Sequence, residues 1–174
     1  MHAMLDIETL GTNPDAPVLS AAVIYFNPHT GETFEYAKFV FDVRQQDRPI
    51  NFDTMKWWMS QSKEASAHWR EAQTYDSLEQ FSAFCSRYEN VIWWANSPAF
   101  DEVIMSHLLR QTGVRVPWNF WAWRDVRTIK SYLFNRTKPN NKNKHDPLDD
   151  CLAQIELVHR FYTEQAMVSF LQEY

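Results

Sequence analysis

Cysteine, glycine and long apolar runs are all scarce in this sequence, and each shortage narrows what the chain can be. The two cysteines, Cys85 and Cys151, are too few and too irregularly spaced for a disulfide framework or a zinc site, which fits a reduced intracellular setting. No apolar run approaches the roughly 18 to 20 residues of a membrane span, and the first residues lack the layout of a secretion signal. With three glycines, no flexible linker divides the chain. These absences predict a cytoplasmic protein with no membrane partner.

An excess of positive charge is also missing. The formal net charge is -5, which argues against a nucleic-acid partner because Lys and Arg contacts to phosphates supply most non-specific affinity. The distribution weakens that argument, since seven basic residues stand against one acid, Asp125, between Arg124 and Lys144, or about +6 for this basic window. We interpret the window as a local basic surface on an acidic protein. The alternative is an ordinary solvated loop rich in lysine.

Apolar and aromatic residues, by contrast, are plentiful. The chain is 45% hydrophobic and 16% aromatic and contains eight Trp. A chain of 174 residues with this composition is long enough to bury a substantial core. The sequence therefore predicts one ordered domain over residues 1–174, without internal repeats.

The order of the predicted elements indicates an α/β fold. Runs rich in Val, Ile, Phe and Tyr predict strands, of which the first three form an antiparallel meander. Apolar residues at helical spacing, with Asn51 and Asp125 as N-caps, predict helices. This order is typical of a mixed five-stranded sheet with helices on both faces. The predicted strands are 3–8, 18–26, 33–41, 90–95 and 120–123, and the predicted helices are 51–59, 63–70, 77–88, 99–112, 125–134 and 147 to about 165.

Two acidic residues near the N-terminus are the strongest chemical signal. Side chains alternate between the two faces of a strand, so Asp6 and Glu8 project from the same face of the first predicted strand. Two carboxylates this close raise each other's pKa unless a cation lies between them, and a hard divalent ion with oxygen ligands is the usual solution. The pair predicts a metal site. The alternative is a solvated strand end.

Further acids and a histidine occur at the places where ligands collect in such folds. Asp101 falls in the first turn of a predicted helix, just beyond the carboxyl end of a strand. Its alternative role is to complement the helix dipole. His145 follows a loop rich in Asn and Lys, and Asp149 and Asp150 open the last helix, which leaves an ambiguity of one residue between the two acids.

With these residues the chain resembles the DEDDh exonucleases of the ribonuclease-H-like fold, which include bacterial proofreading exonucleases and small exoribonucleases. Asp6-Ile7-Glu8-Thr9 matches their first motif, residues 96–101 resemble the second, and His145 with Asp150 matches the third. The three motifs occur in the expected order and cover nearly the whole chain. The third motif's His-x-x-x-x-Asp spacing selects Asp150 over Asp149.

The segment 54–58 and the short length resemble most a branch of single-domain exoribonucleases of bacteria and phages. The resemblance implies a ribonuclease-H-like fold. It also implies a metal-dependent 3'-5' exonuclease that releases nucleoside 5'-monophosphates from single-stranded RNA or DNA 3' ends, with RNA slightly favoured.

The resemblance also implies the chemistry. Two Mg2+ or Mn2+ ions would activate a water and stabilise the leaving 3'-oxygen. His145 would take the proton of that water, because a histidine, with an unperturbed pKa of about 6.5, is suited to this role near neutral pH. The implied metal ligands are Asp6, Glu8, Asp101 and Asp150.

Substrate binding requires rings that stack on bases and cations that meet phosphates. The candidates lie near the motifs and in the basic window. They are Thr9, Leu10, Trp57, Trp58, Phe100, Lys138, Lys142 and Lys144.

Three questions stay open at this point. A catalytically inactive nucleic-acid-binding module of the same fold would be expected to lack an acid or His145, and neither is missing. A two-metal phosphohydrolase of dinucleotides or nucleotides would use the same residues. A homodimer is a further possibility, because the aromatic residues Trp118, Phe120, Trp121 and Trp123 fit a core or an interface equally.

Overall fold

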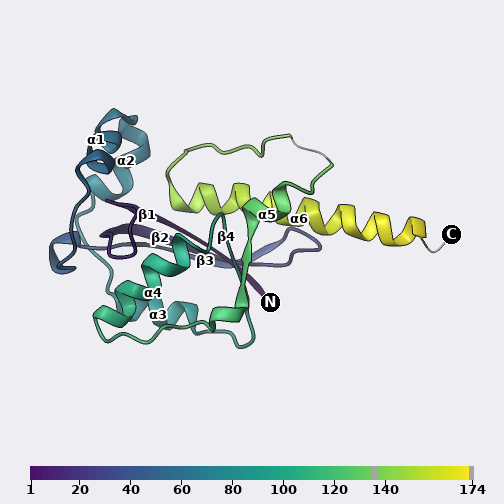
Figure 1. The fold of residues 1–174 in the computed structure, drawn as a ribbon, viewed down its shortest axis with the longest axis horizontal. Coiled ribbons are helices and arrows are strands. Elements are labelled where there is room, and N and C mark those ends of the chain that lie inside the picture. The colour runs from purple at the N-terminus through teal and green to yellow at the C-terminus, as the bar shows by residue number, and fades with distance from the viewer. Residues whose placement is uncertain (135–136, 173–174) are drawn as a thin grey trace.

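A five-stranded mixed sheet forms the centre of the protein (Figure 1). The computed structural model describes residues 1–134 and 137–172, apart from the side chains of residues 68 and 170–172. The strand order is β3-β2-β1-β4-β5, in which β1, β2 and β3 pair antiparallel, β4 runs parallel to β1, and β5 runs parallel to β4. The predicted meander with added parallel strands is confirmed. The strands are β1 His2–Thr9, β2 Val18–Phe26, β3 Thr33–Val40, β4 Ile92–Ala95 and β5 Trp123–Asp125.

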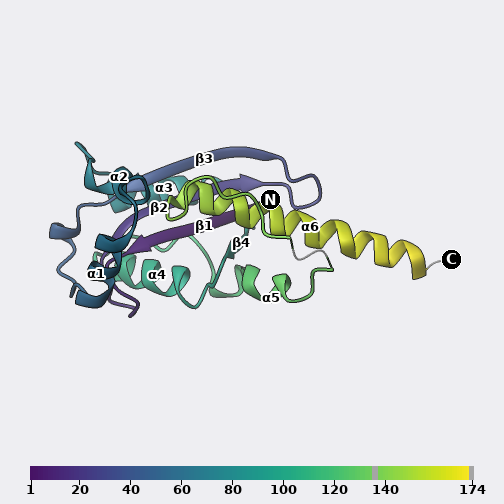
Figure 2. The ribbon, with the colours of Figure 1, turned by 90° about the horizontal axis from the view of Figure 1, so that it is seen from above.

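Helices cover both faces of this sheet, as predicted. Figure 1 shows α6 on one side of the sheet, α3 and α4 on the other, and α1 with α2 beyond the end of β1. Figure 2 shows α6 running along the strands and continuing past them. The helices are α1 Phe52–Ser60, α2 Lys63–Arg70, α3 Leu78–Cys85, α4 Asp101–Gln111, α5 Val126–Lys130 and α6 Pro147–Gln172, with short 3-10 turns η1 Val43–Gln45 and η2 Phe120–Ala122.

The alternation of side chains along β1 separates two cores. Ala3, Leu5 and Ile7 join the core that α3 and α4 close, which also contains Phe81, Trp93 and Leu108. Met4 joins the core under α5 and α6, with Cys151, Ile155 and Val158. Because side chains at every second position share a face, Asp6 and Glu8 continue the Met4 row onto the α6 side. The sheet therefore presents the two carboxylates to the helix that carries Asp150.

Two of the predicted caps are present. The Asn51 side chain accepts a hydrogen bond from the Thr54 amide at the start of α1, and the Asp125 side chain accepts one from the Thr128 amide at the start of α5. Each cap satisfies a backbone donor that the first helical turn leaves without an intrahelical partner.

Three predicted boundaries are wrong. The expected strand 120–123 is the 3-10 turn η2 followed by β5, because the Ala122 amide closes a turn on the Asn119 carbonyl and only Trp123–Asp125 pair with β4. The helix expected to reach residue 134 ends at Lys130, where the Ser131 and Tyr132 amides bond three residues back and tighten the last turn. The last helix runs to Gln172, beyond the expected end near residue 165.

Among the described residues, no helix is long and apolar enough to cross a membrane. Cys85 and Cys151 are both buried free thiols.

Candidate active site

Four elements bring the predicted catalytic residues to the carboxyl end of β1. Asp6 and Glu8 come from β1, Asp101 is the first residue of α4, Asp150 lies in the first turn of α6, and His145 precedes α6. The proximity shows in their electrostatics, since Asp101, Glu8 and Asp150 all raise the pKa of Asp6. Residues about 140 positions apart in the chain therefore share one site.

The deep part of the site contains Asp6 and Asp101. The Gln154 amide of α6 donates a hydrogen bond of 2.7 Å to Asp6 Oδ1. The Ile7 amide of β1 donates one of 3.2 Å to Asp101 Oδ1. Asp101 is only 4% exposed. Both carboxylates are thus fixed from the backbone or from a buried side chain, which sets where a metal ion would meet them.

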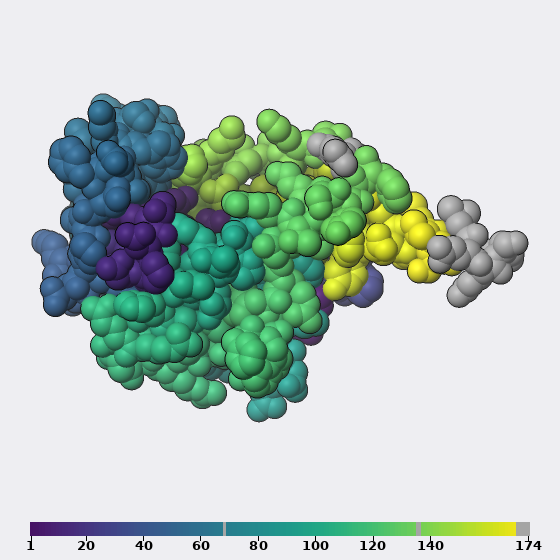
Figure 3. Space-filling view, in the orientation of Figure 1, coloured from purple at the N-terminus to yellow at the C-terminus, as the bar shows by residue number. Residues whose placement is uncertain are grey.

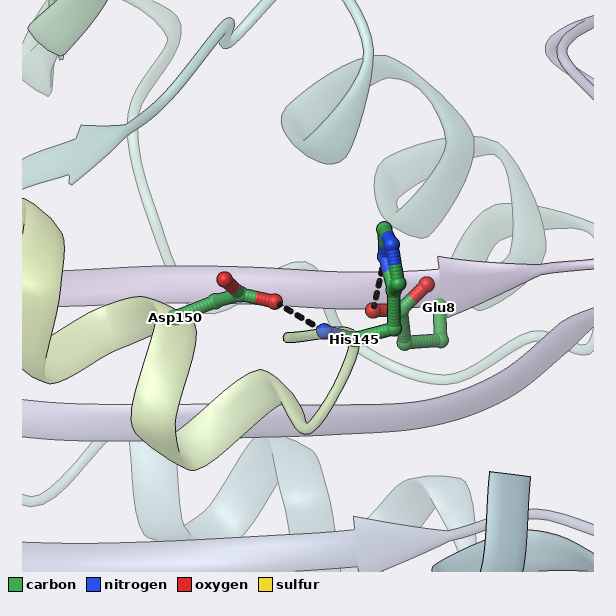
Figure 4. Close-up of side chains that lie close together, drawn as sticks. All are labelled: Glu8, His145 and Asp150. Carbon is green, nitrogen blue, oxygen red and sulfur yellow. Dashed lines mark hydrogen bonds and ion pairs between the residues drawn. The ribbon is translucent and has the colours of Figure 1, made fainter. Parts of the chain in front are cut away.

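The shallower part contains Glu8, His145 and Asp150 (Figure 4). His145 Nδ1 lies 3.8 Å from Glu8 Oε1, and the His145 amide donates a hydrogen bond of 3.0 Å to Asp150 Oδ2. One ligand atom from each of the three residues falls within 4.8 Å of the others. This spacing suits a shared cation or a shared water.

The His145 backbone adopts an uncommon conformation. Its φ is 68°, in the left-handed region that non-glycine residues seldom occupy. Such strain persists only where surrounding contacts impose it. The bond to Asp150 is one such contact, and the His145 ring also meets the edge of Trp57 at 4.8 Å and of Trp58 at 5.9 Å between ring centroids.

The structure separates the two neighbouring acids at the start of α6. Asp149 Oδ2 accepts a hydrogen bond of 2.7 Å from the Asn143 side chain on the preceding loop. Asp150 instead accepts hydrogen bonds from the His145 amide and from the Asn141 side chain, and it belongs to the cluster with Glu8. Asp150 is therefore the acid that faces the site.

Burial and mutual repulsion raise the pKa values of the acids. Burial raises the pKa of Glu8 to about 9, with Asp150 and Asp101 adding to it, and burial raises the pKa of Asp101 to about 7. The pKa of Asp6 is raised well above its ordinary value by burial and then by Asp101. That of Asp150 is raised by burial. Without a cation these groups retain protons at pH values where a free carboxylate is ionised.

The donor set fits hard divalent cations. Carboxylate oxygens are the ligands that Mg2+ and Mn2+ prefer, and cations compensate the repulsion described above. The Gln154 amide nitrogen contacts Asp6 and the Asn141 amide nitrogen contacts Asp150. The oxygens of the same two amides, Gln154 Oε1 and Asn141 Oδ1, are buried without a hydrogen-bond partner. Buried polar atoms of this kind call for a ligand or water. Asp6, Glu8, Asp101 and Asp150 are the residues that would hold the metal.

Three of the predicted substrate-binding residues turn out to be buried. Leu10 is 6% exposed and Trp58 3%, and the two pack together with Leu19. The Trp58 indole donates a hydrogen bond of 2.9 Å to the Thr9 carbonyl, and the Thr9 hydroxyl donates one of 2.6 Å to the Gly11 carbonyl. Leu10 and Trp58 therefore support the end of β1, and their predicted contact with bases stays a prediction.

Trp57 and Phe100 are placed differently. Trp57 is 41% exposed and stands beside His145, so its ring is accessible next to the acids. Phe100 is half-buried against the core under α4, directly before Asp101. Of the predicted platforms, Trp57 has the most accessible position.

The predicted lysines divide between two surface cavities. Lys142 and Lys144 line a cavity of about 490 Å³ together with His145 and Ser62. Lys138 lines another, of about 400 Å³, with Arg127 and Lys130. Arg136, also counted in the basic window, lies outside the described residues. The structure therefore brings two of the three lysines to the histidine and not the third.

Two site residues were missed in the sequence. Gln154 and Asn141 hold the carboxylates of Asp6 and Asp150. Gln154 stands four residues after Asp150, a spacing that places both on one face of a helix, so this signal was available. Asn141 lies in a segment without helix or strand, where no periodicity marks it.

Comparison with known proteins agrees with this geometry. The model of a family described as the 3'-5' exoribonuclease Rv2179c-like domain matches residues 1–162. A protein of Enterobacteria phage T4 named exodeoxyribonuclease is 29% identical over 204 residues, covering 94% of this chain and 89% of the relative.

Solved structures share the fold at low identity. Exonuclease I of E. coli in complex with a dT13 oligonucleotide superposes with a TM-score of 0.68 at 15% identity, over 98% of this chain but only 43% of that longer protein. The nuclease domain of 3'hExo, a DEDDh family member bound to rAMP, gives 0.62 at 11% identity, over 93% of this chain and 91% of that one. These likenesses confirm the ribonuclease-H-like fold.

The match of the family model covers nearly the whole chain, and divalent metal dependence is implied by that membership and by the cluster of acids with His145. The chain belongs to the Rv2179c-like 3'-5' exoribonuclease domain family and is a 3'-5' exonuclease of the DEDDh type.

Proposed function

We propose that residues 1–174 form one exonuclease domain that hydrolyses single-stranded nucleic acid from its 3' end and releases nucleoside 5'-monophosphates, with RNA slightly favoured over DNA. The observation that carries the proposal is the convergence of four carboxylates and one histidine at the carboxyl end of β1. Both solved relatives described above have nucleic-acid components bound, a dT13 oligonucleotide in one and rAMP in the other.

The acids serve as metal ligands in this proposal. Asp6, Glu8, Asp101 and Asp150 would hold two Mg2+ or Mn2+ ions, which when bound supply an acidified water and neutralise charge at the leaving 3'-oxygen. Gln154 and Asn141 orient two of the carboxylates through their amide nitrogens. The third, Asp101, takes its orientation from the Ile7 amide.

His145 acts as the general base. It is the only imidazole in the described acidic cluster, its side chain is one-third exposed, and it reaches to within 3.8 Å of Glu8. A base must lie within hydrogen-bond reach of the proton it takes, directly or through one water. The left-handed backbone and the Trp57 ring hold the imidazole over the acids, where that water would stand.

The terminal nucleotide would lie between the end of β1 and the His145 loop. Trp57 offers an accessible ring to a base, while Lys142 and Lys144 line the cavity next to His145 and can meet phosphates. Thr9 contributes backbone, and Phe100, directly before Asp101, is the second candidate ring. The preference for RNA requires a contact to the ribose 2'-hydroxyl. The description of the family as exoribonucleases supports a preference for RNA, whereas the phage relative is named an exodeoxyribonuclease.

A direct test compares 5'-end-labelled RNA, DNA and dinucleotides, with Mg2+, with Mn2+ and with EDTA. We expect stepwise shortening from the 3' end, faster for RNA, and none in EDTA. Binding without shortening would indicate an inactive module, and cleavage restricted to dinucleotides would indicate a small-substrate phosphohydrolase. Size-exclusion chromatography tests the predicted homodimer independently.

A further inference from the structure

A second aromatic and basic surface lies along the free edge of the sheet. β5 is an edge strand, and the turn before it exposes Phe120 and Trp121, which are 81% and 64% accessible and in edge-to-face contact at 5.0 Å. Large exposed apolar patches mark interaction sites on many proteins, which makes this pair a candidate for one. The active site described above does not use them.

Basic side chains continue this surface toward the acids. Arg124, Arg127 and Lys130 are all exposed, and from Arg115 to Phe134 the one acid is Asp125, whose carboxylate is taken by the α5 cap. The segment forms a green band on the face shown in Figure 3. The local charge is therefore positive on a protein that is acidic as a whole.

Two surface cavities mark the ends of the band. One of about 540 Å³ is lined by Trp121, Arg115 and Arg124, although Glu89 also borders it. The other is the cavity that Arg127 and Lys130 share with Lys138. Aromatic faces alternating with cations are the pattern that binds single strands irrespective of sequence, because rings stack on bases and cations meet phosphates.

The band leads to the active site. The Arg127 amide donates a hydrogen bond of 3.2 Å to the carbonyl of Asn96, directly after β4 and five residues before Asp101. Trp121 lies six residues earlier, at the opposite end of β5, a distance of at most about 20 Å along the chain. A strand whose 3' end is at the acids can therefore extend along this edge.

The opposite edge of the sheet provides an internal comparison. β3 also exposes two aromatic residues, Phe34 at 51% and Tyr36 at 64%, but Glu32 and Glu35 stand beside them. Aromatic exposure is thus common to both edges. The cations near β3, Lys38 and Arg87, are paired with Asp146 and Glu35, whereas the exposed cations of β5 and α5 outnumber the one acid among them. Charge complementarity therefore favours a polyanion on the β5 edge.

We propose that Phe120, Trp121 and Arg124 bind the nucleotides on the 5' side of the scissile end, so that longer single strands bind more tightly than dinucleotides. This inference rests on the proposed exonuclease function for the direction of the strand. It assigns the β5 edge to the substrate and not to a second copy of the chain.

The test compares the double variant Phe120→Ala/Trp121→Ala and the single variant Arg124→Ala with the matched control Phe34→Ala/Tyr36→Ala. Binding of a fluorescent oligouridylate of about 15 nucleotides is measured by anisotropy in EDTA, so that the result does not depend on cleavage. Because stacking contributes roughly 1 to 3 kcal/mol per base, we expect the aromatic variant to raise Kd about tenfold or more. Arg124→Ala should reduce the salt slope, and the control should match wild type.

A second readout separates this proposal from the proposed function. Dinucleotide hydrolysis with Mn2+ should be unchanged in all three variants, since the exposed residues lie away from the acids. If wild type cleaves nothing, the exonuclease proposal fails while the anisotropy still reports on the band. If the aromatic variant keeps wild-type Kd, or converts a dimer to a monomer with Kd unchanged, the β5 edge is not a nucleic-acid surface and the inference is overturned.

Discussion

The two parts of the active site are held in different ways. Asp6 is held by the Gln154 side chain of α6, and Asp101 is held by the Ile7 amide of β1, both within the packed layers of the fold. His145 stands on a loop, in a left-handed conformation imposed by a single hydrogen bond to Asp150 and by contact with two tryptophan rings. The sheet and helices position the metal ligands, and a local contact network positions the base. Metal binding and proton transfer should therefore respond separately to mutation.

Removing an acid should have the largest effect on activity. We expect Asp6→Ala and Asp150→Ala each to abolish exonuclease turnover, because each removes a proposed metal ligand from the cluster. In EDTA near pH 8, the free energy of unfolding of Asp6→Ala should equal or exceed that of wild type. Relief of repulsion from three neighbouring acids would offset the loss of one hydrogen bond, worth about 0.5 to 1.5 kcal/mol. Denaturant unfolding measures the free energy of unfolding, and a gel-based cleavage assay measures turnover. Near-wild-type turnover in either variant would refute the metal assignment.

Removing the base should have a smaller effect that leaves metal binding intact. We expect His145→Ala to lower turnover by about 10² to 10⁴-fold, the usual contribution of a general base, while calorimetry gives a Mn2+ affinity close to wild type. The acidic limb of the pH-rate profile should also move, although a metal-bound water titrates in the same range. Loss of Mn2+ affinity in proportion to activity would make His145 a ligand and withdraw the base role. His159→Ala, on α6 where the ring contacts the Pro28 carbonyl and not the acids, is a matched control for removal of an imidazole.

Withdrawing metal should expose the cost of burying the acids, to which their mutual repulsion adds. The folded-state pKa values of Glu8, about 9, and Asp101, about 7, lie above ordinary carboxyl values, so the folded state binds protons more tightly than the unfolded state. In EDTA these groups should therefore contribute their full stability only below about pH 4, and the contribution should fall as pH rises from there to about 9. One pKa unit corresponds to about 1.4 kcal/mol, or about 2 to 4 °C in Tm for a chain of this size.

The measurement is a thermal scan in EDTA at about pH 5.5 and about pH 8.5, repeated with excess Mg2+. Mg2+ should reduce the loss of Tm at the higher pH, and Glu8→Gln in EDTA should reduce it too. A Tm that stays level across this range, or that rises in EDTA, would contradict the predicted repulsion.

Neutralising the loop lysines should have the smallest effect. We expect Lys142→Ala/Lys144→Ala, next to His145, to weaken binding of longer strands and lower the salt slope by about one per phosphate contact. Lys138→Ala, in the other cavity, should do less to the binding of short substrates. Dinucleotide cleavage should change little. An unchanged salt slope would reduce this loop to a solvated surface.

Much of the fold and the identities of the five proposed catalytic residues were predictable from residue patterns. Alternation in the first strand, the caps Asn51 and Asp125, and three motifs in order all depend on neighbours in the chain. The wrong boundaries lie where local pattern is weak, as at residues 120–123, where a turn replaced the first part of a short strand. Side-chain roles that depend on a distant partner, such as Gln154 beside Asp6, were not found.

The sequence by itself determined which chemistry is present. Side chains alternate along a strand, which puts Asp6 and Glu8 on one face, and Asp101 and Asp150 each lie in the first turn of a helix. Only the tertiary structure decided which side chains stay accessible to substrate. Trp57 and Trp58 are adjacent and chemically identical, yet one is 41% exposed beside His145 and the other is buried with its indole bonded to Thr9. Burial is a property of packing between distant segments, and no local pattern in that tryptophan pair encodes it.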